Sequence, residues 1–198
     1  MNEDLKRSLV QIVEEEGRLR AELASDGSLY EGYPQQIREL HLRQANELEK
    51  IVDIHGWPKI SLVGEEGADA AWLILQHALS RPDFMKRCFP VFERAAQENE
   101  ASLRHLSCLT DGIRYFRRVP QVYGNYFDWN EKGQFEPWDI EEPENVNERR
   151  KKMGLNTLEE RIEEMQADVR KYNLSPPGDY LKWQSDMYRF LREVGWIT

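Results

Sequence analysis

One stretch, residues 111–154, interrupts a chain whose other segments have the apolar spacing of α-helices. It is rich in aromatic and turn-forming residues, and it is dense in side chains that can hold a polar ligand. Residues 121–127 alternate in the manner of a β-strand, and the segment after them supplies a turn and a second short strand. A single hairpin is only marginally stable alone, so it must pack on helices. The sequence therefore predicts a mainly α fold, a single-domain helical bundle with a small two-stranded β-hairpin near residues 121–138.

Apolar residues at helical spacing predict helices through the rest of the chain. The expected helices cover residues 3–24, 35–54, 68–79, a segment that begins at Pro82, 101–116, 143–154, 157–172 and 179–196. The helix at 68–79 is apolar on nearly all sides, which predicts a central and buried position. Its expected core residues are Ala71, Trp72, Leu75 and Ala78.

Three local signals refine these helices. Pro90 predicts a kink or a break in the helix that begins at Pro82. Thr157 followed by Glu160 fits the capping-box pattern at the start of a helix. The segment VGEEG at 63–67 superficially resembles a phosphate-binding loop, but its two glutamates would repel a phosphate and no Walker lysine follows. We interpret it as a turn and a helix start.

The length of 198 residues favours one domain, spanning 1–198. Within this domain we expect an N-terminal helix and loop at 1–33, a core at 34–172 and a C-terminal helical extension at 173–198. The proline-rich break SPPGD at 175–179 precedes the last expected helix.

The charge of the chain argues against nucleic-acid binding. A net charge of −9 and a pI near 5.1 argue against a protein that binds a phosphate backbone, which needs a basic patch. The basic run at 149–152 lies among acidic segments, and we interpret it as a solvated helix face. No apolar run reaches transmembrane length, and the charged N-terminus is unlike a secretory segment. With two cysteines in expected helices, Cys88 and Cys108, we expect a cytoplasmic protein with buried thiols and no disulfide.

The histidines have no local metal-binding pattern. They are His41, His55, His77 and His105, and none has the short spacing to a second ligand that zinc or di-iron sites usually have. We therefore expect no metal and no cofactor, although a site assembled from separate helices stays an alternative. No nucleophile motif such as GxSxG is present.

Gln76 and His77 are polar residues within the apolar helix at 68–79. Burying such groups without partners costs ~1–3 kcal/mol each, so each needs a partner. Two interpretations follow. They either form a structural pair that fixes neighbouring helices, or they face a pocket, where His77 would be suited to proton transfer near neutral pH.

Polar side chains in residues 111–154 are the other candidates for a site. They are Asp111, Arg114, Gln121, Tyr123 and Arg150. The glycine after Tyr123 would let the backbone approach another group closely. The surrounding aromatic residues either cover a hydrophobic seam or form the wall of a ligand pocket. If the helices at 68–79 and 101–116 meet at their ends, His77, Asp111, Gln121 and Tyr123 would line one pocket, with Arg150 entering from the next helix.

Several short motifs occur in an order that resembles a known family. They are HGWP at 55–58, LQHA at 75–78, LTDGIRYF at 109–116, QVYGNYF at 121–127 and VNERRKKMGL at 146–155. Together they resemble an uncharacterised bacterial family, the domain of unknown function 6624 family, over roughly residues 40–165. The family pattern has Asp-Arg where this chain has Asp111-Gly112, and Tyr-Gly-Thr-Gln where it has Tyr123-Gly124-Asn125-Tyr126. The resemblance implies a mostly helical domain with no established activity.

Two functional hypotheses follow. In the first, the protein is an enzyme acting on a small polar or phosphorylated molecule. His77 and Asp111 would then be catalytic, and Gln76, Arg114, Gln121, Tyr123 and Arg150 would bind the substrate. In the second, it is a binding or interaction module without chemistry, such as a toxin–antitoxin or immunity component. No protein partner can be named from the sequence.

Overall fold

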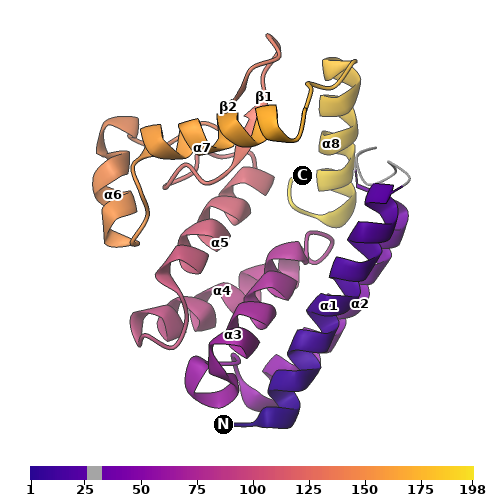
Figure 1. Ribbon diagram of the computed structural model, residues 1–198, viewed down its shortest axis with the longest axis vertical. Coiled ribbons are helices and arrows are strands. Elements are labelled where there is room, and N and C mark those ends of the chain that lie inside the picture. Colours follow the sequence, from indigo (N-terminus) through magenta and orange to yellow (C-terminus); the bar gives the residue numbers. More distant parts are fainter. Residues whose placement is uncertain (26–32) are drawn as a thin grey trace. The chain divides into compact units, whose positions relative to one another are not determined.

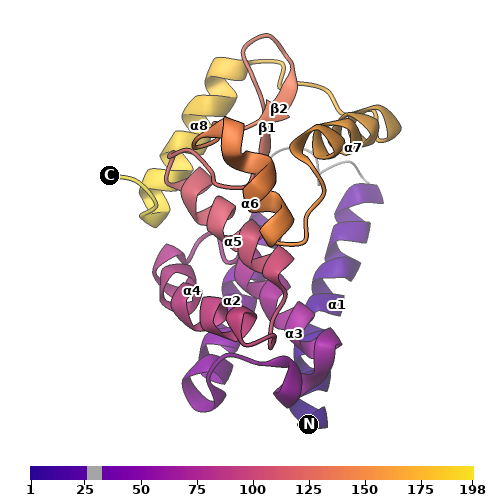
Figure 2. The same ribbon diagram turned by 90° about the vertical axis from the view of Figure 1, so that its left-hand side faces the viewer.

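A computed structural model describes residues 1–25 and 33–198 of the chain. These residues form mostly α-helices and one two-stranded antiparallel sheet (Figures 1 and 2), which confirms the mainly α fold with a small hairpin. They divide into two compact units, residues 1–102 and 103–198, which are described here one after the other. The expectation of one domain stays a prediction, and most of the loop expected before residue 34 lies outside the described residues.

The described residues of the first unit form four helices. They are α1 (Glu3–Ser25), α2 (Gln35–His55), α3 (Ile60–His77) and α4 (Pro82–Gln97). Helix α1 packs along both α2 and α3, and the two views agree on this arrangement (Figures 1 and 2). The apolar faces of the helices meet in a core that includes Leu9, Leu48, Val63 and Leu75. Trp57, in the turn after α2, packs edge to face on Phe92 of α4 and completes this core.

Helix α3 begins earlier than the sequence predicts, at Ile60 instead of residue 68. The predicted turn persists as an interruption at Gly64, whose φ of 71° and ψ of 171° lie outside the helical region. Only glycine adopts such a conformation without strain. Beyond it, Ala71, Leu75 and Ala78 are at most 1% exposed, as expected, whereas Trp72 is half-buried.

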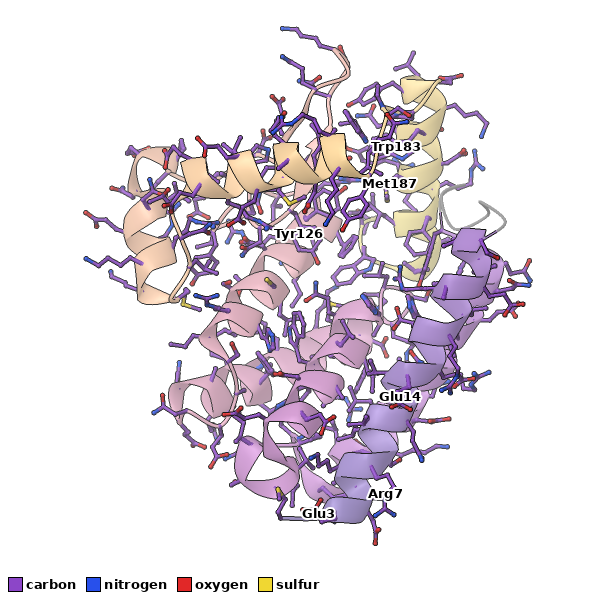
Figure 3. All side chains as sticks on the ribbon, viewed as in Figure 1. Glu3, Arg7, Glu14, Tyr126, Trp183 and Met187 are labelled. Atoms are coloured by element: carbon purple, nitrogen blue, oxygen red, sulfur yellow. The ribbon has the colours of Figure 1, made fainter. Side chains whose placement is uncertain are left out.

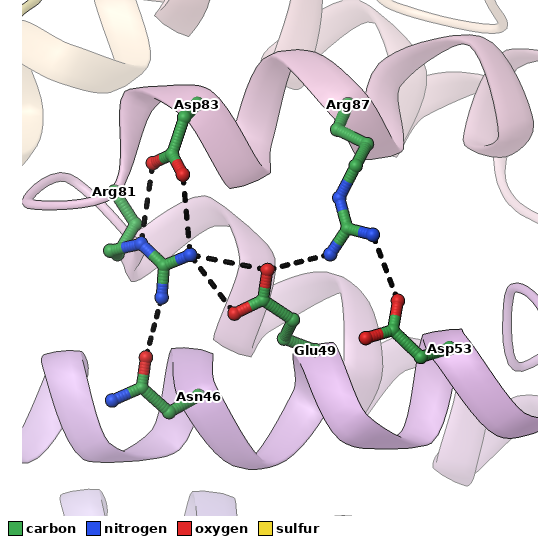
Figure 4. A network of polar contacts seen from close by, with 6 residues as sticks. All are labelled: Asn46, Glu49, Asp53, Arg81, Asp83 and Arg87. Atoms are coloured by element: carbon green, nitrogen blue, oxygen red, sulfur yellow. Dashed lines mark hydrogen bonds and ion pairs between the residues drawn. The ribbon is translucent and has the colours of Figure 1, made fainter.

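A network of charged side chains joins α4 to α2 (Figure 4). The carboxylate of Glu49 lies 2.9 Å from Arg81 Nη2 and 2.6 Å from Arg87 Nη2, and Arg87 Nη1 lies 2.8 Å from Asp53 Oδ1. Pairs at a protein surface contribute only ~0.2–1 kcal/mol each. Helix α4 begins at Pro82 as predicted. It continues through Pro90 to Gln97, so the predicted break does not occur.

The second unit contains the hairpin. Its elements are α5 (Leu103–Phe116), β1 (Phe127–Trp129), β2 (Phe135–Pro137), the 3₁₀ turn η2 (Pro143–Asn145), α6 (Val146–Lys152), α7 (Leu158–Lys171) and α8 (Tyr180–Val194). The strands pair antiparallel, with Phe127 opposite Pro137 and Trp129 opposite Phe135. Thr157 and Glu160 form the predicted capping box at the start of α7.

An aromatic core holds the second unit together. Tyr115 and Phe116, at the end of α5, contact the ring of Tyr126 (labelled in Figure 3), and Trp196 after α8 packs on Phe116. The Arg118 guanidinium lies over three aromatic rings, including that of Tyr188 of α8 at 5.1 Å. Tyr126 and Trp138 of the central stretch therefore pack on Tyr115 at the end of α5, as expected if these two residues cover a hydrophobic seam.

None of the helices in the described part of the chain combines the length and the apolar character needed to cross a membrane.

Candidate functional site

The predicted site residues fall in both units. Gln76 and His77 are in the first unit, at the end of α3. The others are in the second unit: Asp111, Arg114, Gln121, Tyr123 and Arg150. Each unit has its own set of polar contacts, and the single pocket predicted to join the two sets stays a prediction.

His77 is held by a glutamate of α1. Its Nδ1 lies 2.9 Å from Glu16 Oε2, and its ring stacks on that of His41 from α2, with centroids 4.8 Å apart. The side chains of Glu16 and His41 are at most 4% exposed, whereas that of His77 is 23% exposed. Glu16 thus lies where a carboxylate that orients the His77 ring would lie.

The second histidine of this cluster has a distinctive environment. His41 Nδ1 lies 2.8 Å from the Tyr33 hydroxyl, and His41 Nε2 lies 3.1 Å from Glu16 Oε1. The first contact is a hydrogen bond, but the second is too poorly aligned to be one, and this buried nitrogen has no other hydrogen-bond partner among the described residues. We name the group Glu16, His41 and His77 the histidine cluster.

In the histidine cluster, the surroundings favour the charged carboxylate of Glu16 and the neutral imidazole of His41. Burial raises the pKa of Glu16, but His41, His77 and the Arg20 guanidinium stabilise the carboxylate more strongly and hold its pKa well below the usual range. Burial lowers the pKa of His41, which keeps that ring neutral. Such a set can hold a proton, a metal ion or a polar ligand atom.

Glu16 and His41 were missed as site residues, although the sequence contains a signal for each. Glu16 follows Leu9 and Ile12 at helical spacing and precedes Leu23, so it lies on the buried face of α1 within an acidic run. His41 interrupts the apolar stripe of α2. A buried acid on one apolar stripe and a histidine on another indicate a shared polar cluster.

Asp111 organises the segment before the hairpin. It is fully buried, and its carboxylate accepts hydrogen bonds from the backbone N–H groups of Val122 at 2.7 Å, Tyr123 at 3.0 Å and Asn125 at 3.0 Å. The Asn125 side-chain amide donates a further bond at 2.9 Å. Burial raises the pKa of Asp111, and the hydrogen bonds only partly oppose this effect. These contacts are those of a residue that holds a loop.

Gln121 has a similar role in the same segment. Its side-chain amide donates to the carbonyls of Tyr126 at 2.9 Å and Trp138 at 2.8 Å, and its side-chain oxygen accepts from the Tyr126 N–H at 2.9 Å. Arg114 contacts the Pro120 carbonyl and pairs with Glu141. The roles in substrate binding that the sequence assigned to Gln121 and Arg114 stay predictions.

Arg150 is buried among neutral acceptors. It is 1% exposed, and it donates to the Tyr123 carbonyl at 2.6 Å, the Asn156 carbonyl at 2.7 Å and the Asn156 side-chain oxygen at 2.9 Å. No carboxylate of a described residue lies within ion-pair distance of its guanidinium. Burial is the main cause that lowers the pKa of Arg150. Nearby, the backbone at Gly124 approaches α7 so closely that a Cβ there would lie 2.7 Å from Leu158 Cδ1.

A cavity of about 330 Å³ lies beside Arg150, and we name it the arginine cavity. It is lined by Arg104, Cys108, Asn125, Arg150, Leu155, Asn156, Arg161 and Glu164. Glu164 pairs with Arg161 at 3.0 Å, which leaves two of the three arginines without a carboxylate among the described residues. The cavity is therefore locally positive in a chain with a net charge of −9.

A second hollow of similar volume lies along α1 in the first unit. It is lined in part by Glu3, Arg7 and Glu14, which are labelled in Figure 3, and by Lys6 and Glu66, which pair at 2.9 Å. Its lining is exposed, and acids and bases alternate in it. It is therefore a weaker candidate for a ligand site than the arginine cavity.

The two units together define a mainly α protein with a histidine cluster in one unit and a positive cavity in the other. Residues 3–173 of the chain match the model of a family described as Family of unknown function (DUF6624). The match covers most of the chain, so the protein belongs to this family, as the motifs in the sequence indicated. Comparisons with curated proteins and with solved structures found no match.

Proposed function

We propose that the protein is an enzyme that acts on a small anionic molecule, phosphorylated or carboxylated, and binds it in the arginine cavity. The single observation that carries this proposal is the buried guanidinium of Arg150, which faces neutral acceptors and has no described carboxylate partner. A buried charge is unfavourable unless an opposite charge accompanies it. A bound anion would supply that charge.

The composition of the cavity fits a ligand of this class. Arginine offers a planar fork of N–H groups that pairs with two oxygens of a phosphate or carboxylate at once. Arg104 and Arg161 flank Arg150, and Asn125 and Asn156 add polar groups that can fix the orientation of a ligand. The volume of about 330 Å³ suits a small molecule. Because the chain as a whole is acidic, a local excess of arginine is specific to this place.

The alternative is a binding or interaction module, in which Arg150 only holds the segment around Tyr123 in place. The hydrogen bonds of Arg150 to Tyr123 and Asn156 favour this alternative. Arg104, another arginine of the cavity, favours the first hypothesis. It is exposed and its guanidinium makes no hydrogen bond to a described residue, so it is available to contact a ligand.

The test is a binding screen on the intact protein. Inorganic phosphate and a panel of small phosphorylated and carboxylated molecules are compared with uncharged analogues by thermal shift and calorimetry. We expect an anionic molecule to bind, with at least ~10-fold weaker binding after Arg104→Gln or Arg161→Gln, since each removes a charged contact. The matched control is Arg189→Gln, which removes an exposed arginine outside the cavity in the same unit. If no anion binds, or if the control weakens binding equally, the proposal is wrong and the interaction module replaces it.

We also infer a cytoplasmic location for this enzyme. Cys88 and Cys108 are both free, and free thiols are typical of a reducing compartment.

A further inference from the structure

We propose that the histidine cluster, Glu16, His41 and His77, binds a divalent transition-metal ion. This site is independent of the arginine cavity, because all three residues belong to the first unit. They come from three different helices, α1, α2 and α3, which explains why no local spacing in the sequence revealed them.

The ligand atoms already have the separations that one metal ion needs. A nitrogen or oxygen ligand lies ~2.0–2.2 Å from zinc, so two ligands of one tetrahedral ion lie roughly 3–3.5 Å apart. Glu16 Oε1 lies 3.1 Å from His41 Nε2, and Glu16 Oε2 lies 2.9 Å from His77 Nδ1. All the candidate ligand atoms lie within 4.8 Å of one another. Small side-chain rotations would therefore bring them around a common ion.

A second observation points to a ligand at the same place. His41 is 3% exposed, and its Nε2 points toward Glu16 without a hydrogen bond to any described residue. A buried nitrogen without a partner is unfavourable, and a metal ion on Nε2 would remove that deficit. The opposite nitrogen, Nδ1, is held by the Tyr33 hydroxyl at 2.8 Å. This is the arrangement of a metal-binding histidine, whose second nitrogen is usually fixed by a hydrogen bond.

The surroundings determine which ions suit the site. Two imidazoles with one carboxylate favour zinc and its first-row neighbours over magnesium or calcium, which prefer oxygen ligands. Arg20 donates to Glu16 Oε1 at 2.6 Å, so a bound metal ion would share this carboxylate with the Arg20 guanidinium. The side chain of His77 is 23% exposed, more than the other two ligands. Water or a substrate atom could therefore complete the coordination from that side. A three-ligand site with an open position is typical of catalytic metal centres.

The experiment measures metal binding directly. The full chain is freed of metal with a chelator and titrated with Zn²⁺ by calorimetry and with Co²⁺ by visible absorption. We expect about one ion per chain, which matches one three-ligand cluster, and we expect a cobalt spectrum of four- or five-coordinate geometry. His77→Gln should abolish the stoichiometric binding and the spectrum. His55→Gln is the matched control, because His55 is an exposed histidine on the same helix as His41.

Two further variants keep the test decisive. Tyr33→Phe removes no ligand, and it should weaken Zn²⁺ binding by about 10- to 100-fold, the usual effect of losing a hydrogen bond to a ligand. Glu16→Gln should abolish binding, and if it unfolds the protein, the partly exposed His77 variant still decides the question. The proposal is overturned if wild-type protein binds no stoichiometric ion, if His77→Gln binds as wild type, or if His55→Gln loses binding equally. Binding of anions in the arginine cavity is measured separately, so either proposal can fail alone.

Discussion

Asn125 is tied to Asp111 twice, because the Asp111 carboxylate accepts from the Asn125 backbone N–H at 3.0 Å and from its side-chain amide at 2.9 Å. The backbone N–H groups of Val122 and Tyr123 point to the same carboxylate. The Asp111 side chain, on α5, therefore accepts hydrogen bonds from three backbone N–H groups of the turn at residues 122–125. Asp111 therefore helps to fix the position of that turn, which includes the carbonyl bound by Arg150.

Asp111→Ala should lower the free energy of unfolding by about 3 kcal/mol or more, since it leaves several buried donors unsatisfied at ~1–3 kcal/mol each. Urea unfolding measures the loss. The control is Glu163→Ala, which removes an exposed carboxylate of α7 and should change the free energy of unfolding by less than ~0.5 kcal/mol. A loss below ~1 kcal/mol for Asp111→Ala would show that water replaces the carboxylate and that Asp111 is free for another role.

Substitutions at Gly112 and Tyr126 should have coupled effects on the free energy of unfolding. A Cβ at position 112 would lie 2.5 Å from the Tyr126 hydroxyl oxygen and 3.0 Å from Cζ, so Gly112→Ala should destabilise the protein by roughly 1–3 kcal/mol through overpacking. Tyr126→Leu shortens the opposing side chain. In the double variant the two losses should not add, and a double-mutant cycle measures the coupling energy. Additive losses would show that the ring moves aside without cost.

Leu75→Ala should lower the free energy of unfolding by about 2–5 kcal/mol, the usual range for truncating a buried leucine. Leu75 is fully buried on α3. Chemical denaturation provides the measurement, and Leu181→Ala is the control because Leu181 is 72% exposed on α8. A loss below ~1 kcal/mol at Leu75 would mean that α3 is peripheral to the core of the first unit.

Ionisation of the buried Asp128 carboxyl should lower the free energy of unfolding as the pH rises. Burial raises the pKa of Asp128, although the Tyr115 hydroxyl donates to it at 2.6 Å. A raised carboxyl pKa means that the folded protein holds this proton to a higher pH than the unfolded chain does, for which the ordinary value is 3.8. The contribution of this group to stability is therefore full below pH 3.8 and is lost as the pH rises through the raised pKa.

The comparison with Asp128→Asn isolates this effect, since asparagine keeps an acceptor for Tyr115 and cannot ionise. Unfolding of both proteins is followed in urea at a series of pH values from acid to neutral. The wild type should lose stability relative to Asp128→Asn as the pH rises. A wild type that gains relative to the variant would show that the Tyr115 hydrogen bond outweighs burial.

The sequence predicted local structure well, because helical spacing and caps are properties of neighbouring residues. Thr157 and Pro82 begin their helices as expected. The alternation at residues 121–126 did not give a strand, because the Asp111 side chain takes the backbone N–H groups that a neighbouring strand would need. Tertiary packing determines that contact, so no spacing in the sequence reveals it.

In the candidate site too, local patterns predicted single residues but not their contacts with other helices. His77 was identified because a polar residue on an apolar helix stands out locally. Its contact with Glu16 spans α1 and α3, and neither the contact nor the stacking on His41 follows from any local pattern. The burial of Glu16 was predictable from its helical spacing to Leu9 and Ile12, but not the identity of its partners.

The two histidines of the cluster should differ in their effect on stability. In chelator-treated protein, His77→Ala should leave the melting temperature near that of the wild type or above it, since the ring is 23% exposed and functional polar groups are often poor for stability. Tyr123→Phe should behave in the same way. His41→Ala should lower the free energy of unfolding by ~2 kcal/mol or more, because it leaves a buried cavity and removes the hydrogen bond between His41 and the Tyr33 hydroxyl. Melting followed by circular dichroism compares the variants. If His77→Ala unfolds the protein as readily as His41→Ala does, both histidines are structural, and the proposal that His77 is a metal ligand is wrong.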